Sequence, residues 1–456
     1  MRSEQLLAVM ATAAGLGTQA VAAIDLDIRS VGSIKSAAAA VAGGAMKYYN
    51  SNQPDEAPGT LPEPYYWWQS AVMFNVLVDY GVHTGDSTYN EPVNQAILHQ
   101  RGPDNNFQPS NQSSSLTNDD QAMWALTALS AAEFSFGSPP AQLPWVDLSK
   151  NAFERQVSRW EDGNCGGGLK WTVYSFQRGH TYSNTLSNGA FFELSSRLAR
   201  YTKEEKYLEW AVKAWDWMSK VGLVTEDFKV FDGTDREGDC KEVNRLQWSI
   251  NTAFLLSGAA NLYNATNEDS IWKSRVDGLL KGADIFFKDD IMIEPACEAT
   301  NKCNIDQKTY KAILSRALGT TTQLAPFTRD AILPKIRASA TAAAEKCMEK
   351  DGVAQCSFKW VDKGSNDNTK PTLGEQLAAL QIIQANLVAE NQGRALADSP
   401  GSGENTGGGF DGAPTDGALP TSPSPGAASS VMDLRFQRLR VIMAITGLPI
   451  LFGVVL

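Results

Sequence analysis

The sequence is poor in the residues that hold metal ions and phosphates. It has 3 His in 456 residues and no Cys-x-x-Cys pair, so a zinc site is not expected. The glycine triplet Gly166-Gly167-Gly168 is not followed by Lys-Ser or Lys-Thr, as a phosphate-binding loop requires. No Gly-x-Ser-x-Gly elbow of a serine hydrolase is present. We therefore expect neither a metal nor a cofactor.

Positive charge is also in deficit. Lys and Arg number 40 against 51 Asp and Glu, which leaves a formal net charge of −11. Nucleic acids and anionic membrane surfaces attract basic proteins, so neither is an expected partner. The composition is otherwise globular, with 43% hydrophobic residues, and the length suits one large domain or a few ordinary ones.

The alternating pattern of β-strands is scarce, and only Gly168–Phe176 and Phe228–Phe231 favour short hairpin strands. Instead, helical apolar spacing recurs between about Ser30 and Gly393, interrupted by Gly, Pro and Asn. Expected helix starts lie near Ser30, Trp67, Tyr89, Asp119, Trp145, Thr181, Glu204, Gln247, Glu268, Asp306, Pro326 and Thr372. This pattern predicts a single all-α domain, and six helical hairpins suggest closure into an (α/α)6 barrel.

The N-terminus has the features of a secretory signal peptide. One early Arg, a short apolar stretch and an Ala-x-Ala end span residues 1–23, and cleavage is expected after Ala22 or Ala23. The folded domain is then expected at residues 24–394. We therefore expect secretion through the endoplasmic reticulum of a eukaryotic cell.

The C-terminus has the features of a lipid-anchor signal. Residues 395–430 are rich in Gly, Ser and Pro and predict a linker. In residues 431–456 a polar spacer precedes a short apolar end with a central Pro, which is short for a membrane span. This arrangement is typical of a removed glycosylphosphatidylinositol (GPI) propeptide, with attachment between Gly426 and Ser430. A plain tail anchor is the alternative.

Cysteines and glycosylation sequons agree with the secretory route. All 6 Cys fall within residues 24–394, and an even number suits disulfides. Proximity in sequence suggests two short-range pairs and leaves one long-range pair. The predicted disulfides are Cys297–Cys303, Cys347–Cys356 and Cys165–Cys240. Sequons at Asn111 and Asn264 predict N-linked glycans.

Two adjacent carboxylates, Asp119 and Asp120, stand where a helix should begin, and Thr117 or Asn118 can cap that helix. In a first turn both side chains can lean towards one cavity, about 5–6 Å apart, as in retaining glycosidases. At an effective dielectric of about 20 they repel by about 3 kcal/mol, enough to keep one carboxyl protonated. The plainer interpretation is that the pair complements the helix dipole.

Aromatic and amide side chains gather in the loop-rich segments Glu63–Ser70, Gly166–Tyr174 and Tyr182–Gly189. Flat rings stack on the C–H faces of sugars and amides bind their hydroxyls, so these segments indicate a saccharide site. Asp232 is a further candidate, although an Asp-Gly pair is ordinarily a turn.

Together these segments resemble glycoside hydrolase family 76, the endo-α-1,6-mannanases, and most closely its lipid-anchored fungal wall members. The matching segments run in family order: Glu63–Trp68, Asn118–Gln121, Ser130–Glu133, Cys165–Trp171, Asn184–Gly189, Leu198–Tyr201, Trp215–Met218, Gln247–Ser249 and Glu294–Glu298. One departure is Glu375, which stands where the family has an amide; it concerns one rim of the groove and the choice of acceptor.

The resemblance implies an (α/α)6 fold and a retaining mechanism, with Asp119 as nucleophile and Asp120 as acid and base. It implies a donor of α-1,6-mannan or GPI-core glycan and a wall β-glucan as acceptor, so that the enzyme links mannoprotein to the wall. The expected substrate contacts are Trp67, Trp68, Trp124, Trp171, Tyr174, Asn184, Asn188, Asp232 and Trp248. A catalytically silent glycan-binding protein and a structural wall protein are the alternatives.

Overall fold

The computed structural model describes residues 22–50, 56–137, 139, 143–362, 371–389 and 396. The predicted signal peptide up to residue 21, nearly all of the linker and the predicted propeptide lie outside these residues. No helix of the described ranges is long and apolar enough to cross a membrane.

Twelve α-helices form within the described residues, one for each predicted helical segment. The inner helices are α2 (Trp67–Thr84), α4 (Asn118–Glu133), α6 (Thr185–Thr202), α8 (Ser249–Ala265), α10 (Tyr310–Leu324) and α12 (Leu373–Ala389). The outer helices are α1 (Val31–Met46), α3 (Asn90–Gln100), α5 (Trp145–Val157), α7 (Glu205–Lys220), α9 (Ser270–Gly282) and α11 (Arg329–Ala344).

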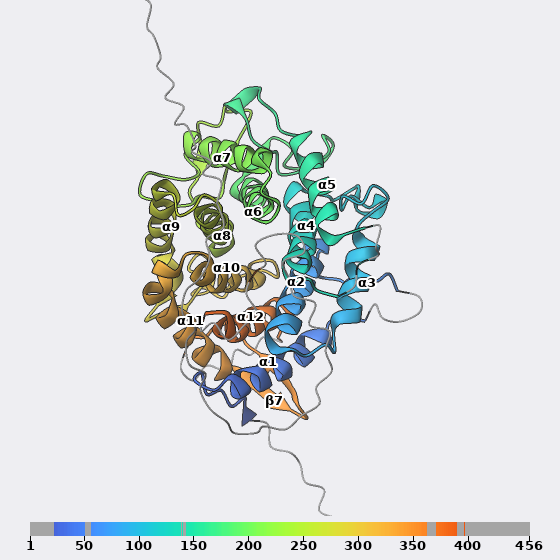
Figure 1. Cartoon of the computed structure of the whole chain (residues 1–456), viewed down its shortest axis with the longest axis vertical. Coiled ribbons are helices and arrows are strands. Elements are labelled where there is room, and N and C mark those ends of the chain that lie inside the picture. Colours follow the sequence, from blue (N-terminus) through green and yellow to red (C-terminus); the bar gives the residue numbers. More distant parts are fainter. Residues whose placement is uncertain are drawn as a thin grey trace, which may run out of the picture. The chain divides into compact units, whose positions relative to one another are not determined.

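The inner helices close into a ring (Figure 1). Each one packs against the next along the chain, and α12 returns to contact α2. The outer helices cover this ring from outside, α5 on α4 and α6, α7 on α6, and α9 on α8. The fold is therefore an (α/α)6 barrel, and the closure that sequence periodicity supports only weakly is confirmed.

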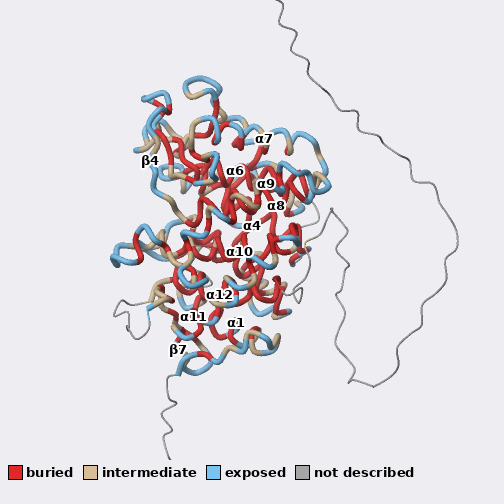
Figure 2. Tube along the Cα trace, turned by 90° about the vertical axis from the view of Figure 1, so that its left-hand side faces the viewer, coloured by how far each residue is buried: buried red, intermediate tan, exposed pale blue. Residues whose placement is uncertain are grey.

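Burial separates the two layers. Every residue of α12 is buried, so this helix is apolar or hydrogen-bonded on all sides, as a helix inside a core must be. By contrast, α7 buries one stripe that includes Tyr207, Ala211 and Trp215. Figure 2 shows the same division, with buried residues through the middle of the molecule and exposed residues along its outer loops.

Short strands connect the helices. One antiparallel sheet has the order β1 (Ala22–Ala23), β7 (Cys347–Lys350) and β8 (Val353–Cys356). A second has the order β2 (Tyr182–Asn184), β3 (Gly233–Asp235) and β4 (Val243–Asn244). In the third, β5 (Phe287–Lys288) pairs with β6 (Ile291–Met292). The expected strands at Gly168–Phe176 and Phe228–Phe231 do not form. They contribute only the isolated bridges Thr117–Thr172 and Val224–Val230, because the first segment instead lies beside the loop before α4.

Paired charges lie among apolar side chains between the inner helices of the barrel. Arg197 Nη2 lies 2.6 Å from Glu133 Oε2, and Arg200 Nη2 lies 2.9 Å from Glu133 Oε1. Arg316 Nε pairs with Asp79 Oδ2 at 2.9 Å. Because these groups are almost completely buried, each charge depends on its partners for its stability.

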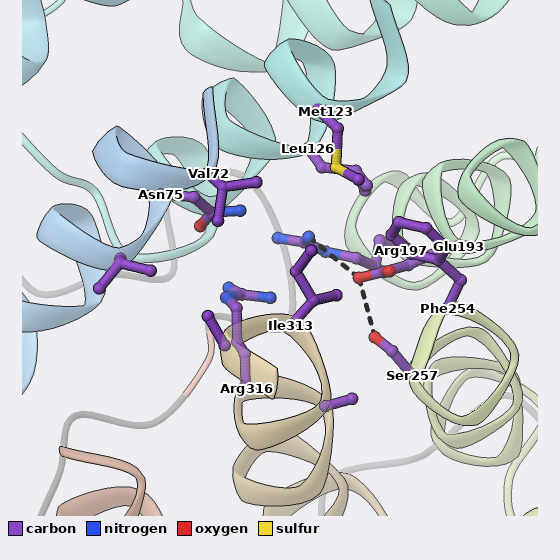
Figure 3. Close-up of a pocket in the computed structure, with 13 residues that line it drawn as sticks. Val72, Asn75, Met123, Leu126, Glu193, Arg197, Phe254, Ser257, Ile313 and Arg316 are labelled. Atoms are coloured by element: carbon purple, nitrogen blue, oxygen red, sulfur yellow. Dashed lines mark hydrogen bonds and ion pairs between the residues drawn. The ribbon is translucent and has the colours of Figure 1, made fainter. Parts of the chain in front are cut away.

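A small cavity of about 30 Å³ lies beside this network, between α2, α4, α6, α8 and α10. Figure 3 shows Arg197, Glu193 and Ser257 linked on one side of it, with Arg316 and Asn75 facing from the other. A volume of this size holds about two water molecules and is too small for a sugar ring. A substrate must therefore bind elsewhere.

Candidate active site

A cleft of about 550 Å³ lies where the inner helices begin. It is lined by the first residues of α2, α4, α6 and α10 and by the loops before them. The lining residues are Thr60, Leu61, Tyr65, Tyr66, Trp67, Trp68, Ser70, Gln112, Ser115, Thr117, Asp119, Asp120, Trp171, Leu186, Asp306 and Tyr310. This volume is in the range of small-ligand sites.

Asp119 and Asp120 lie in the first turn of α4, as the sequence predicts. Thr117 is the N-cap: its Oγ1 accepts the Asp120 backbone N–H at 3.2 Å, and the Asp120 carboxylate accepts the Thr117 N–H at 3.2 Å. This reciprocal capping box holds Asp120 in place. The loop is anchored further because Asn118 N donates to the Trp171 carbonyl at 2.9 Å.

Asp119 has a different partner. Its Oδ1 accepts a hydrogen bond of 2.6 Å from Ser187 Oγ, in the first turn of α6. Burial raises the pKa of Asp119 to about 6, although the Ser187 hydrogen bond opposes the rise by stabilising the charged form. Asp119 is therefore ionised at neutral pH.

Asp120 is the more weakly acidic of the two. Burial raises its pKa well above the ordinary value, and the neighbouring charge of Asp119 raises it further. As pH rises, Asp120 is therefore the second of the two carboxyls to lose its proton. An ionised carboxylate beside a protonated one is the arrangement that retaining glycosidic cleavage requires.

A third carboxylate, Asp306, faces the same cleft and was not among the residues expected from the sequence. Its Oδ1 accepts the Trp68 indole N–H at 3.1 Å, and its charge contributes to the raised pKa of both Asp119 and Asp120. Burial raises the pKa of Asp306 itself. Asp306 lies 238 residues from Trp68 in sequence, so no local pattern could have indicated it.

Aromatic side chains form the walls. Trp67, Trp68 and Trp171 line the cleft, as predicted, and Trp67 is oriented by a 2.7 Å hydrogen bond from its Nε1 to Gln100 Oε1. The ring of Trp171 lies against Gly179, where an added Cβ would come within 2.6 Å of Cε3. A larger residue at position 179 would therefore displace Trp171.

Asp232 and Trp248 lie beside Tyr310, a cleft residue that the sequence did not indicate. The Trp248 and Tyr310 ring centroids are 5.8 Å apart in an edge-to-face arrangement. Asp232 Oδ2 accepts hydrogen bonds from the Tyr182 hydroxyl at 2.6 Å and from Asn244 Nδ2 at 3.0 Å. Asp232 is thus fixed in a polar cluster next to the cleft, and burial raises its pKa.

Four expected substrate contacts have other roles in this structure. Trp124 is completely buried against Trp67, Phe74 and Phe107, so it belongs to the core and does not line the cleft. The remaining three make internal hydrogen bonds. Asn184 caps α6, and Asn188 accepts the Leu169 N–H and donates to the Leu169 carbonyl. The Tyr174 hydroxyl accepts from Gln108 Nε2. Helix capping and backbone pairing thus occupy the two Asn side chains, and the Tyr174 hydroxyl holds Gln108.

The loop that carries Trp171 is closed by a disulfide. Cys165–Cys240 joins it to the segment after β3, and the other two disulfides are Cys297–Cys303 and Cys347–Cys356. Gly168 adopts a positive φ of 92°, and an added Cβ would lie 2.3 Å from the Trp217 ring. The glycine triplet therefore permits close packing of the backbone on Trp217.

Glu375 does not face the cleft. It is fully buried, pairs with Lys308 Nζ at 2.7 Å and accepts a hydrogen bond from the Thr372 N–H. Lys308 lies two residues after Asp306, in the short segment before α10. Glu375, which stands where the family has an amide, therefore contacts this cleft-lining segment from the side away from the cleft. Residues 363–370, which precede α12, lie outside the described residues.

Glu294 is a further buried acid that the sequence analysis did not identify as functional. It accepts the Ser249 N–H at 3.3 Å and also contacts the Ser249 hydroxyl at the start of α8. Burial raises its pKa to about 8, so it is protonated at neutral pH.

In the described part of the chain, no group of three or more His, Cys, Asp or Glu side chains is arranged to hold a metal ion.

Two adjacent buried carboxyls of unequal pKa, in an aromatic cleft at the helix N-termini of an (α/α)6 barrel, are the arrangement of a glycoside hydrolase. The profile of Glycosyl hydrolase family 76 matches residues 33–398. The chain therefore belongs to this family, as the sequence resemblance predicts.

Relatives cover most of both chains. Mannan endo-1,6-alpha-mannosidase DCW1 of Saccharomyces cerevisiae is 38% identical over 387 residues, 82% of this chain and 86% of the relative. The crystal structure of Dfg5 from Chaetomium thermophilum in complex with glucosamine is 37% identical, covers 84% of this chain and 98% of its own, and superimposes with a TM-score of 0.77. The GH76A alpha-1,6-mannanase of Salegentibacter sp. HEL1_6, 18% identical with a TM-score of 0.62, supports the fold alone.

Proposed function

We propose that this protein is a retaining endo-α-1,6-mannosidase of the fungal cell wall that acts as a transglycosidase. The observation that carries the proposal is the unequal pair of carboxyls in one aromatic cleft, with the pKa of Asp120 raised further than that of Asp119. Relatives 36–41% identical over most of the chain are named as mannan endo-1,6-alpha-mannosidases, which supports the substrate class.

In the first step the Asp119 carboxylate attacks the anomeric carbon of a mannose unit while Asp120 transfers its proton to the leaving glycosidic oxygen. This forms a mannosyl-enzyme and leaves Asp120 ionised. In the second step Asp120 removes a proton from the acceptor hydroxyl, which attacks the anomeric carbon and releases Asp119. The proton is then again on Asp120, so the cycle balances.

The donor we propose is α-1,6-mannan or the core glycan of a GPI-anchored glycoprotein. Such a core contains glucosamine, whose ammonium group is attracted to carboxylates. Asp306 and Asp232 place two further acids at or beside the cleft, in addition to the catalytic pair. The relative from Chaetomium thermophilum was crystallised with glucosamine, which supports a site for an amino sugar.

The acceptor we propose is a wall β-glucan, and the place of action is the outer face of the plasma membrane or the wall. A signal peptide at residues 1–23, a catalytic domain at 24–394, a linker at 395–430 and a GPI propeptide at 431–456 would bring the enzyme there. These assignments rest on sequence pattern.

The test combines the secreted protein with a defined α-1,6-mannoside and excess glucan oligosaccharide, and products are read by mass spectrometry. Mannosylated glucan that disappears in the Asp119→Asn variant is expected. Shortened mannosides alone would reduce the proposal to a hydrolase. Saturable mannoside binding with no product would replace it with a glycan-binding protein.

A further inference from the structure

The predicted sequon Asn111-Gln112-Ser113 lies in the loop that leads directly into the catalytic helix α4. Asn111 belongs to a short 3-10 helix, Ser110–Gln112, and both Asn111 and Ser113 are exposed. The Asn111 side chain makes no hydrogen bond to any other described residue. Its amide is thus free to carry a glycan.

The neighbours of Asn111 belong to the cleft. Gln112 and Ser115 line it together with Asp119 and Asp120. A glycan on Asn111 therefore begins one residue from the cleft wall, on the side formed by the loop before α4.

This loop is held in place, so a glycan on it would stay at the rim. Leu116 N donates to Gln112 O at 2.8 Å, which closes the turn that carries the sequon. Gln177 Nε2 donates to Leu116 O at 3.0 Å and Val173 N donates to the same carbonyl at 3.3 Å. The loop is therefore tied to the segment that follows Trp171.

We propose that an N-linked glycan on Asn111 is a size filter at this end of the cleft. An N-linked glycan is bulky and hydrophilic, and it sweeps out the space around its attachment point. Short mannosides, including the core glycan of a GPI-anchored donor, pass beneath it into the cleft, whereas branched mannan polymers that extend over Gln112 and Ser115 enter more slowly. The size filter rests on the proposed secretory route and mannosidase activity, and it adds a modification that sets which donors enter.

The second sequon provides a matched control. Asn264 lies in the last turn of α8 and is exposed, whereas Trp248, which caps the start of α8, packs against the cleft residue Tyr310. With a rise of 1.5 Å per residue, Asn264 is about 24 Å along the helix axis from Trp248. A glycan on Asn264 is therefore at the opposite end of the barrel.

The experiment uses the full protein secreted from a glycosylating host, with site occupancy read by peptide mass spectrometry. The variants are Asn111→Gln and Ser113→Ala, which remove the same glycan by different substitutions, and Asn264→Gln. Rates are measured on a short α-1,6-mannoside and on high-molecular-mass mannan.

Loss of the Asn111 glycan is expected to raise the polymer-to-oligosaccharide rate ratio at least about threefold, with the short-mannoside rate unchanged. Asn264→Gln is expected to leave the ratio as in the unmodified sequence. An unoccupied Asn111, or an unchanged ratio in both glycan-free variants, would overturn the size filter.

If no form of the protein cleaves any mannoside, the proposed activity has failed, and the size filter is then judged from binding. The same glycoforms are compared for affinity towards the short mannoside and the polymer. A gain in polymer affinity confined to the two Asn111-site variants supports the size filter, and equal affinities contradict it.

Discussion

Ser187 Oγ donates a 2.6 Å hydrogen bond to Asp119 Oδ1, from the first turn of α6 to the first turn of α4. Asp120, one residue further, closes the cap of its own helix instead: its carboxylate accepts the Thr117 N–H, and its own N–H donates to Thr117 Oγ1. The two carboxylates are thus distinguished by their hydrogen-bond partners, which come from α6 for Asp119 and from the cap of α4 for Asp120. This difference favours Asp119 as nucleophile and Asp120 as acid.

Replacement of either Asp119 or Asp120 should remove activity without loss of stability. Asp119→Asn and Asp120→Asn are each expected to lower kcat/KM for an α-1,6-mannoside by at least about 1,000-fold. Because burial disfavours the charged carboxylates, neutral amides should not lower the melting temperature. Turnover and thermal unfolding are measured on the same preparations; a variant with near-normal turnover would refute the assignment.

Ser187→Ala should move the acid limb of the pH–activity profile to higher pH. The Ser187 hydroxyl stabilises the ionised form of Asp119, so its removal raises the pKa of this carboxyl. Activity below pH 7 then falls more than activity above it. Ser149→Ala, which removes a hydroxyl bonded to a backbone carbonyl between α5 and α4, serves as control and should leave the profile in place.

Asp306→Asn should move the pH–activity profile to lower pH, opposite to the shift expected for Ser187→Ala. The charge of Asp306 helps to raise the pKa of both Asp119 and Asp120, so a neutral amide lowers both values. The amide oxygen can still accept the Trp68 N–H. The profile of kcat/KM against pH should shift to lower pH at both limbs; a shift upwards, or none, would show that Asp306 does not act on the pair through charge.

Glu294→Gln should stabilise the protein at alkaline pH. The folded pKa of about 8 exceeds the ordinary value of 4.5, so between these values the folded state holds a proton that the unfolded state lacks. Stability therefore falls by about 1.4 kcal/mol per pH unit as pH rises through this window, and levels off above about pH 8. Glutamine resembles the protonated acid and removes this dependence.

The measurement for Glu294→Gln is the melting temperature between pH 5 and pH 9. The variant should lose less stability than the unmodified protein over this interval. Glu226→Gln, a substitution on the exposed surface, is the control and should follow the unmodified protein. Parallel curves for all three proteins would contradict a protonated Glu294.

Glu133→Gln should destabilise the barrel strongly. The substitution leaves the buried Arg197 and Arg200 without their shared carboxylate, and breaking one partner of a buried ion pair costs about 3–5 kcal/mol. Figure 3 places Arg197 beside the axial cavity, where little water is available to replace Glu133. Denaturant unfolding gives the value; Glu154→Gln, in an exposed pair with Lys206, should change it by less than about 1 kcal/mol.

Much of the fold could be predicted because helices depend on local pattern. The apolar spacing marked all twelve helices, and the capping residues ahead of Asp119 placed Asp119 and Asp120 in a first turn. The short-range pairs Cys297–Cys303 and Cys347–Cys356 followed from proximity in the chain. The strands expected at Gly168–Phe176 and Phe228–Phe231 do not form, because long-range loop contacts override short alternating patterns.

The substrate contacts were harder to predict, because residue type does not show where a side chain points. Trp124 and Trp171 both stand beside polar segments, yet α4 directs Trp124 into the core while the loop directs Trp171 into the cleft. Asn184 and Asn188 have the chemistry of a sugar-binding site, but backbone groups of α6 and Leu169 use their hydrogen bonds.

The family, the twelve helices and the position of Asp119 and Asp120 follow from short segments of the amino-acid sequence, since all three rest on residues adjacent along the chain. Which of the two acids is the weaker depends on the folded barrel. Ser187 is 68 residues from Asp119, and Asp306 reaches the cleft from the start of α10. The pKa order arises from burial and long-range charge, and both exist only once the barrel has closed.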